Sequence, residues 1–197
     1  MKIIGLTGGT GSGKGFVASY LKKNGAYIID ADEIAHDIIH KGRPAYNELV
    51  EIFGEGILDE DRNIIRKALG KIVFSDGEKL KVLNECTHKH IGLEVEKRAE
   101  EAAKMNDTYK FVVYDAPLLL DTDFKEKCDE VWVVFADAET RANRIMERDG
   151  ISKSDAENRI ASQKDWEFYK NAADVVIDNS KGNDDVLKDL DELLNRI

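Results

Sequence analysis

The sequence predicts an α/β fold in which a mostly parallel sheet of five strands is flanked by helices. Short apolar runs alternate with helical stretches along the 197 residues, and this order is typical of parallel sheets covered on both faces. A glycine-rich segment joins the first apolar run to the first helical stretch. Aspartates follow three of the later runs, where the carboxyl ends of parallel strands gather ligands.

The first strand and the first helix lie on either side of that glycine-rich segment. Residues 1–6 are mainly apolar and suit a buried strand. Residues 14–23 place Phe16, Val17 and Leu21 near one face of a helix. The glycines therefore connect a strand to the N-terminus of a helix.

Four further strands are expected at residues 26–29, 111–114, 131–135 and 175–177. A final helix is expected at residues 184–197, with leucines on one face and acids on the other. The long segment between the second and third strands reads as mainly helical. We expect a core at about residues 1–32, 108–140 and 172–197, a helical insertion at about 33–107, and a lid at about 141–171.

The glycine-rich segment has the pattern of a phosphate-binding loop. Gly8, four further residues, Gly13 and Lys14 fit the motif G-x-x-x-x-G-K. Glycine lets the backbone wrap closely around a phosphate, and backbone amides at a helix N-terminus attract anions. We therefore expect a bound nucleoside triphosphate. The residues expected at it are Gly8, Gly9, Thr10, Gly11, Ser12, Gly13, Lys14, Gly15 and Phe16.

This loop departs from the motif directly after its lysine. A Ser or Thr hydroxyl that binds Mg²⁺ is usual there, whereas this chain has Gly15 followed by Phe16. Mg²⁺ commonly keeps several waters, so a water can take that position. The lost ligand is worth roughly 1.5–3 kcal/mol. We expect weaker metal binding, and not its abolition.

Two acidic positions are candidates for the chemistry. Transfer to an alcohol needs a carboxylate that orients the acceptor hydroxyl and takes its proton. Asp32 is our candidate, and Asp30 is the alternative, while either can instead be a helix N-cap. Asp115 follows the apolar run of residues 111–114 and is expected to hold Mg²⁺ through water.

A run of arginines suggests a lid over the nucleotide. Arg141, Arg144 and Arg148 recur at helical spacing, Asp149-Gly150 breaks the helix, and Arg159 lies in the next one. Arginines on such a helical pair can neutralise transferring phosphate and exclude water. The alternative is a solvated face that pairs with Glu139 and Glu147.

Composition excludes several classes of function. The 29 basic and 39 acidic residues give a net charge of −10, which argues against binding to nucleic acid or to an anionic membrane. No apolar run approaches the ~18 residues of a membrane span, and the chain enters its first strand at once, so we expect no signal peptide. Cys86 and Cys128 lack metal-binding spacing and are expected to be free thiols in a reducing compartment.

Taken together, these motifs resemble the dephospho-CoA kinase family almost from end to end. Lys89 and the pair Gly15-Phe16 are departures, since proline and Ser-Thr are usual there. The segments that carry the resemblance are Gly5-Leu6-Thr7-Gly8-Gly9, Ile28-Ile29-Asp30-Ala31-Asp32, Arg66-Lys67-Ala68-Leu69, Leu83-Asn84 with His88, Asp115-Ala116-Pro117-Leu118-Leu119, the arginines up to Arg159 with Gln163, and Ala173-Asp174-Val175-Val176-Ile177-Asp178-Asn179.

The resemblance implies a P-loop kinase fold with a helical coenzyme-binding insertion and a lid. It implies ATP- and Mg²⁺-dependent phosphorylation of the ribose 3′-hydroxyl of dephospho-CoA, the last step of coenzyme A synthesis, in a cytoplasmic protein that is monomeric or weakly self-associating. It favours Asp32 over Asp30 as the base, with Lys14 and Arg144 also catalytic. Further nucleotide contacts are implied for Arg144, Arg148, Asn179 and Gly182. Substrate contacts are implied for Asp32, Arg66, His88, Pro117, Leu118 and Arg159.

Two other functions remain open at this point. A nucleotide-binding regulator with impaired catalysis is suggested by Gly15-Phe16 alone. A kinase for a nucleoside monophosphate or another small alcohol is suggested by Gly13-Lys14-Gly15, which resembles the adenylate kinase loop. Lys14, Asp32 and the lid arginines favour an active enzyme.

Overall fold

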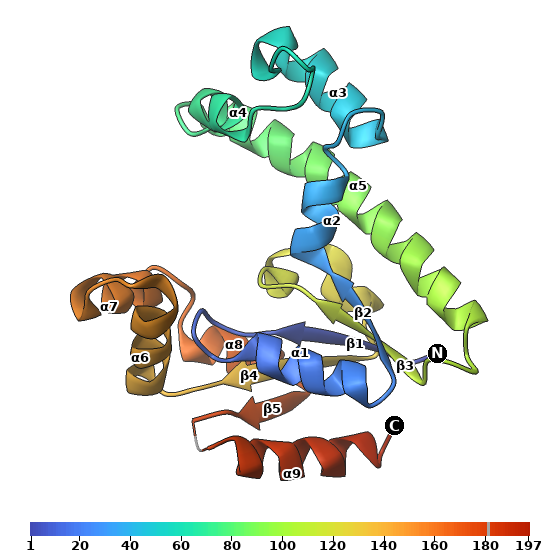
Figure 1. The fold of residues 1–197 in the computed structure, drawn as a ribbon, viewed down its shortest axis with the longest axis vertical. Coiled ribbons are helices and arrows are strands. Elements are labelled where there is room, and N and C mark those ends of the chain that lie inside the picture. The colour runs from blue at the N-terminus through green and yellow to red at the C-terminus, as the bar shows by residue number, and fades with distance from the viewer. Residues whose placement is uncertain (181) are drawn as a thin grey trace. The chain divides into compact units, whose positions relative to one another are not determined.

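The computed structural model describes residues 1–180 and 182–197, and these divide into two compact units. The first unit comprises Met1–Ile29 and Ala102–Ile197, and the second comprises Asp30–Glu101. Figure 1 shows the sheet in the first unit and the long helix α5 that leads out of the second. We describe each unit by itself.

The described residues form one parallel five-stranded sheet, in the order β2-β3-β1-β4-β5. This confirms the predicted α/β class, and each predicted strand is present within one or two residues of its expected bounds. Because β1 is the central strand, the loop that follows it has neighbouring strand ends on both sides. The strands are β1 Ile3–Thr7, β2 Ala26–Asp30, β3 Phe111–Asp115, β4 Glu130–Phe135 and β5 Val175–Asp178.

Helices α1 (Lys14–Lys23) and α9 (Asn183–Leu194) pack on the same face of the sheet. Their buried side chains join those of alternating strand residues in the largest core cluster, because side chains two apart on a strand share a face. Helix α1 has the predicted bounds, while α9 ends before the predicted residue 197. The sheet unit also contains helix α8 (Trp166–Ala172) and the 3₁₀ turns η2 (Leu119–Asp121) and η3 (Asp123–Lys127).

Helices α6 (Ala138–Asp149) and α7 (Lys153–Ala161) form a helical hairpin. Ala142, Ile145 and Ala156 make a small apolar core between them. Helix α6 ends where Asp149-Gly150 predicts it, because Gly150 takes the left-handed conformation (φ 65°) that commonly terminates a helix. Helix α7 starts at Lys153, and the side chain of the preceding Ser152 caps it by accepting from the amide of Asp155.

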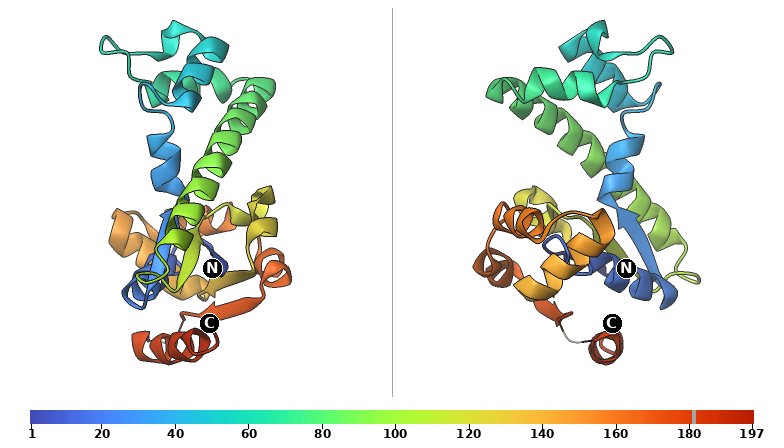
Figure 2. Two further views of the ribbon diagram at one scale, coloured as in Figure 1. Left: turned by 90° about the vertical axis from the view of Figure 1, so that its right-hand side faces the viewer. Right: turned by 60° about the vertical axis from the view of Figure 1, so that its left-hand side comes forward.

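The second unit is helical, as its sequence pattern predicts. Its core consists mainly of aliphatic side chains, together with Cys86. Both views of Figure 2 show α5 as one long continuous helix. Among the helices of the described residues, none is both long and apolar enough to cross a membrane. The elements that begin in this unit are α2 Ala31–Asp37, α3 Pro44–Phe53, η1 Glu55–Ile57, α4 Arg66–Val73 and α5 Gly77–Lys104.

Candidate active site

The glycine-rich loop connects the end of β1 to the start of α1, as predicted. Two of its glycines have left-handed backbone angles, with φ 77° at Gly11 and φ 89° at Gly13. At Gly8 the constraint is space, because an added Cβ would lie 2.6 Å from the backbone oxygen of Val134. The loop therefore needs glycine both for its turns and for the close approach of neighbouring backbone.

Lys14 pairs with Asp115 at the carboxyl end of the sheet. Asp115 is the last residue of β3, and the strand register places it beside Leu6 of β1, one residue before the strand ends. The Lys14 ammonium forms an ion pair with the Asp115 carboxylate, and their side chains are only 19% and 9% exposed. The predicted phosphate-binding cation and the predicted metal ligand are thus direct neighbours.

Arg141 of α6 is fixed to the outer part of the loop. Its Nε donates to the carbonyl of Thr10 at 2.8 Å, and its Nη2 donates to Oε1 of Gln163 at 2.8 Å. The same Gln163 oxygen accepts from the amide of Thr10 at 2.8 Å. These three contacts close a ring, so the loop, α6 and the segment that follows α7 hold one another.

Arg144, one helical turn further along α6, holds the inner part of the loop. It donates to the carbonyl of Ser12 at 3.1 Å and to that of Asn179 at 2.9 Å. Asn179 in turn donates from Nδ2 to the Ser12 carbonyl at 2.7 Å and is 2% exposed. Asn179, predicted near the nucleotide, supports the loop by these bonds.

The two guanidinium groups leave positive charge uncompensated at this site. Neither Arg141 nor Arg144 has a carboxylate within ion-pair distance among the residues that the structure describes, and their hydrogen-bond acceptors are neutral oxygens. Burial lowers the pKa of Arg141, as expected for a cation without an anionic partner. Two cations on a loop of backbone amides favour binding of an anion, although the chain as a whole is acidic.

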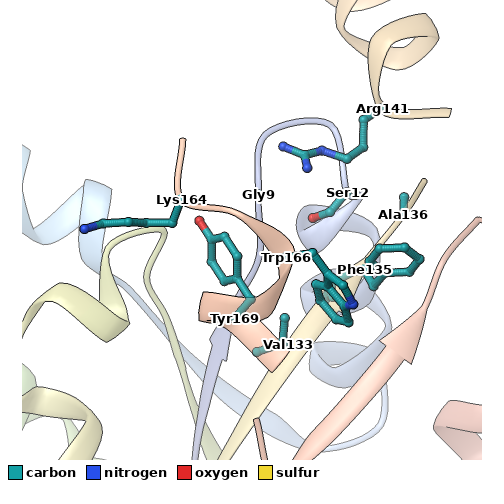
Figure 3. Close-up of a pocket in the computed structure, with 10 residues that line it drawn as sticks. Gly9, Ser12, Val133, Phe135, Ala136, Arg141, Lys164, Trp166 and Tyr169 are labelled. Atoms are coloured by element: carbon teal, nitrogen blue, oxygen red, sulfur yellow. The ribbon is translucent and has the colours of Figure 1, made fainter. Parts of the chain in front are cut away.

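A small cavity lies between the loop, β4 and α8 (Figure 3). Its volume of about 30 Å³ suits a single water and not a nucleotide. Ser12, Trp166 and Tyr169 are among the side chains that line it. The Ser12 hydroxyl is buried without a hydrogen-bond partner in the described part of the chain. This cavity is therefore too small to hold a triphosphate.

The outer arginines of the lid have a different role. Arg148 donates from Nε to Oδ1 of Asp149 at 2.7 Å, and Arg159 of α7 pairs with the other carboxylate oxygen. These bonds hold the pKa of Asp149 at about 2, well below its ordinary value. Within residues 1–180 and 182–197, these two arginines pair with Asp149 and not with Glu139 or Glu147, the alternative that the sequence left open.

On the acceptor side, the structure separates Asp30 from Asp32. Oδ1 of Asp30 accepts the amides of Asp32 at 2.8 Å and Glu33 at 3.0 Å, so Asp30 is the N-cap of α2. Asp32 lies in the first turn of that helix and its side chain is exposed. Capping therefore uses Oδ1 of Asp30, whereas the Asp32 side chain is exposed to solvent.

The other predicted substrate residues are distributed over both units. In the helical unit, Arg66 is the first residue of α4 and His88 lies on α5, and both are exposed. In the sheet unit, the carbonyl of Pro117 accepts from the Thr7 hydroxyl at 3.2 Å, and Leu118 is 63% exposed.

Three more residues were predicted to bind the nucleotide, namely Gly15, Phe16 and Gly182. Phe16 packs its ring on the sheet core, and its amide donates to the carbonyl of Gly13 at 2.9 Å. Gly15 has open space around it, because an added Cβ would meet no heavy atom within 4 Å. Gly182 is exposed and precedes α9.

Arg141 and Gln163 are the site residues that the sequence did not single out. Arg141 was read only as one of several lid arginines, and Gln163 only as part of a segment. The sequence feature that could have indicated Arg141 is its position three residues before Arg144, which places both arginines on one face of a helix. Spacing alone does not say which arginines face the loop.

Comparison with known proteins identifies the family of this chain. The family model for dephospho-CoA kinase matches residues 2–185. A dephospho-CoA kinase of Carboxydothermus hydrogenoformans is 44% identical over 180 residues, covering 91% of this chain and 86% of the relative. The structure is similar to that of the dephospho-CoA kinase from Campylobacter jejuni, with a TM-score of 0.71, 27% identity, and coverage of 100% and 97% of the two chains.

A more distant structural neighbour confirms the fold class alone. Shikimate kinase from Bacteroides thetaiotaomicron has a TM-score of 0.55 at 14% identity, covering 99% of this chain and 97% of its own. The fold is therefore that of the P-loop kinases. With the loop, its paired lysine and a family match over nearly the whole length, the chain belongs to the dephospho-CoA kinase family.

Proposed function

We propose that this protein transfers the γ-phosphoryl group of ATP to the ribose 3′-hydroxyl of dephospho-CoA, giving coenzyme A and ADP. The observation that carries the proposal is the cationic loop, in which Lys14, Arg141 and Arg144 converge on glycine-rich backbone at the carboxyl end of β1. Family membership supplies the acceptor, because the loop by itself suits many phosphate donors and acceptors.

On the nucleotide side, the backbone amides of residues 8–15 would receive the phosphates. Lys14 would exchange Asp115 for the β- and γ-phosphates, and Arg144 would stabilise the charge of the transferring group. Arg148 and Gly182 are proposed to contact the nucleotide as well. Asn179 contributes by holding Ser12 and Arg144 in place.

The residues at the loop could hold a magnesium ion, with a single carboxylate, that of Asp115, as the protein ligand. Asp115 is an oxygen donor next to Lys14, and Mg²⁺ prefers such ligands while it keeps several waters. Gly15 contributes no ligand, so Asp115 and waters would hold the ion. When bound, Mg²⁺ neutralises phosphate charge and orients the triphosphate.

On the acceptor side, Asp32 is proposed to accept the proton of the 3′-hydroxyl. The capping role of Asp30 and the exposure of Asp32 support this assignment. Arg66 and His88 are proposed to contact the coenzyme from the helical unit. Pro117, Leu118 and Arg159 are proposed to contact it from the sheet unit.

The same proposal extends to the larger parts of the chain. Residues 33–107 would bind the coenzyme, and residues 141–171 would close as a lid whose helices are linked through Asp149. Cys86 and Cys128 are both free thiols, which supports a reducing compartment such as the cytoplasm. We propose a monomer with at most weak self-association.

The test is an ADP-release assay with MgATP and single acceptors. We expect ADP with dephospho-CoA and none with nucleoside monophosphates or shikimate. Nucleotide binding without turnover on any acceptor would instead identify a nucleotide-binding regulator, and turnover on a monophosphate alone would identify another small-molecule kinase.

Asp32→Asn tests the proposed base. We expect nearly unchanged ATP binding and at least about tenfold lower kcat, the low end of general-base effects. Asp30→Asn is the matched control, since an amide oxygen can still cap α2. Wild-type turnover of the Asp32 variant would refute its role.

A further inference from the structure

Three side chains of metal-binding type meet inside the helical unit, away from the phosphate loop in sequence. They are Glu48 of α3 and Cys86 and His90 of α5. One ligand atom of each lies within 4.8 Å of those of the other two. Cys86 and His90 are four residues apart on one helix and so share a face. The third ligand comes from another helix, which explains why sequence spacing did not indicate a site.

The cluster has a buried side and an open side. Cys86 is 4% exposed and belongs to the aliphatic core of the unit. The His90 side chain is 11% exposed and that of Glu48 is 33% exposed. A metal ion can therefore enter past the carboxylate, and a water can occupy a coordination position there.

The existing contacts already direct the ligand atoms toward one another. His90 Nε2 lies 2.7 Å from Oε2 of Glu48, and Lys89 Nζ lies 3.0 Å from the same oxygen. Lys89 can stay bonded to Glu48 when the carboxylate binds a metal, as outer groups commonly do for carboxylate ligands. Packing of Cys86 and an ion pair at Glu48 would explain each residue singly. Neither explanation requires the Cys86 sulfur, a His90 nitrogen and a Glu48 oxygen to lie this close together.

We propose that Glu48, Cys86 and His90 bind one zinc-class divalent ion, with water as a fourth ligand. A thiolate, an imidazole and a carboxylate are ligands that Zn²⁺ accepts together, whereas Mg²⁺ and Ca²⁺ prefer oxygen alone. Tetrahedral zinc bonds of about 2.0–2.3 Å put ligand atoms roughly 3.5 Å apart. His90 Nε2 and Glu48 Oε2, which are 2.7 Å apart, would separate by about 0.8 Å, and no pair of ligand atoms would approach by more than about 1.3 Å, from at most 4.8 Å to roughly 3.5 Å. Side-chain rotation can supply such shifts.

Binding displaces the thiol proton of Cys86 to solvent and uses the neutral His90 ring. The bound ion would connect α3 to α5 and stabilise the helical unit. This inference goes beyond the proposed kinase activity and does not depend on it.

The test is a Co²⁺ titration of the full-length protein without nucleotide, in a phosphine reductant. Co²⁺ replaces Zn²⁺ in such sites, and a thiolate ligand gives a near-ultraviolet charge-transfer band. We expect this band to saturate at one equivalent per chain and Zn²⁺ to abolish it. No band, or a band that Zn²⁺ does not displace, would overturn the proposal.

Variants assign the ligands. Cys86→Ser should abolish the band, while Cys128→Ser, the control for the other thiol, should leave it unchanged. Glu48→Gln provides a second test in case Cys86→Ser folds poorly. This substitution keeps a hydrogen-bonding side chain on a partly exposed residue. It should weaken Co²⁺ binding at least about tenfold, since even outer-shell changes cost 10–100-fold. A band that survives Cys86→Ser, or unchanged affinity in Glu48→Gln, would refute the site.

Discussion

Replacing Gly15 by serine restores the hydroxyl that phosphate-binding loops usually place after their lysine. The structure allows this change without rearrangement. A Cβ at Gly15 meets no heavy atom within 4 Å, and Gly15 is not among the glycines with positive φ. The new side chain therefore occupies open space next to Lys14, and its effects can be read as those of the hydroxyl and of helix propensity.

Two magnitudes follow from this position. Gly15 is the second residue of α1, where alanine is favoured over glycine by about 0.8–1 kcal/mol, and serine by about half as much. A hydroxyl bonded to a charged partner adds about 1.5–3 kcal/mol. At 1.4 kcal/mol per factor of ten, the Mg²⁺ concentration for half-maximal rate should fall about ten- to hundredfold.

The assay is ADP formation at fixed ATP and dephospho-CoA over a range of Mg²⁺, for wild type, Gly15→Ser and Gly15→Ala. Only serine should shift the Mg²⁺ dependence, whereas both variants should unfold at higher urea. If serine and alanine behave alike toward Mg²⁺, water already replaces the hydroxyl without loss, and the metal argument fails. If Gly15→Ala is less stable than wild type, the space around Gly15 is not open.

Three further outcomes follow from the contacts of the lid and the two thiols. Arg144→Met should lower the free energy of unfolding in urea by about 1.5–3 kcal/mol, because buried carbonyls lose a charged donor; an unchanged midpoint would contradict this. The Asp149 pKa is about 2 against a usual value near 3.9, so its arginine partners stabilise the fold fully above about pH 4 and lose that effect as pH falls toward 2. The difference in free energy of unfolding between wild type and Asp149→Asn should therefore decrease as pH falls from about 4 to 2. A difference that does not depend on pH would refute the stabilising role of the Asp149 carboxylate. Burial raises the pKa of Cys86 to about 11 and of Cys128 to about 12, so iodoacetamide at about pH 8 should alkylate both slowly until urea unfolds the chain. Rapid labelling of either thiol in the folded protein, followed by mass spectrometry, would contradict the burial.

Local patterns predicted the strands, the loop and the acids at strand ends because these features depend on neighbouring residues. The apolar run before Asp115 correctly predicted that this aspartate lies at the carboxyl end of its strand. Its pairing with Lys14 depends on the register between β1 and β3, which no local pattern determines. The sequence therefore identified both groups and missed their contact.

The arginines show the same limit on a single helix. Arg144 and Arg148 are equally plausible lid residues by spacing, yet one bonds the loop and the other bonds Asp149. The difference arises from how α6 packs beside the loop. Likewise, Glu48 lies close to Cys86 only because α3 and α5 pack together, so the sequence does not indicate the proposed metal cluster.

The contacts of the three cations at the loop suggest that the two arginines and the lysine act differently when a nucleotide binds. Arg141 and Arg144 donate to neutral carbonyl and amide oxygens, and a guanidinium has five N–H groups, so each can keep these bonds and still bind phosphate. Their positive charge is thus already oriented before the ligand arrives, which is the condition for effective electrostatic stabilisation of a developing charge. Lys14 differs because its partner is an anion, and the pair is largely buried, so separating it is costly unless another charge replaces the lost partner. Under the proposed function, a bound phosphate would give Lys14 a new anionic partner and Mg²⁺ would give Asp115 a cationic one, so that neither charge would be left buried without a counter-charge.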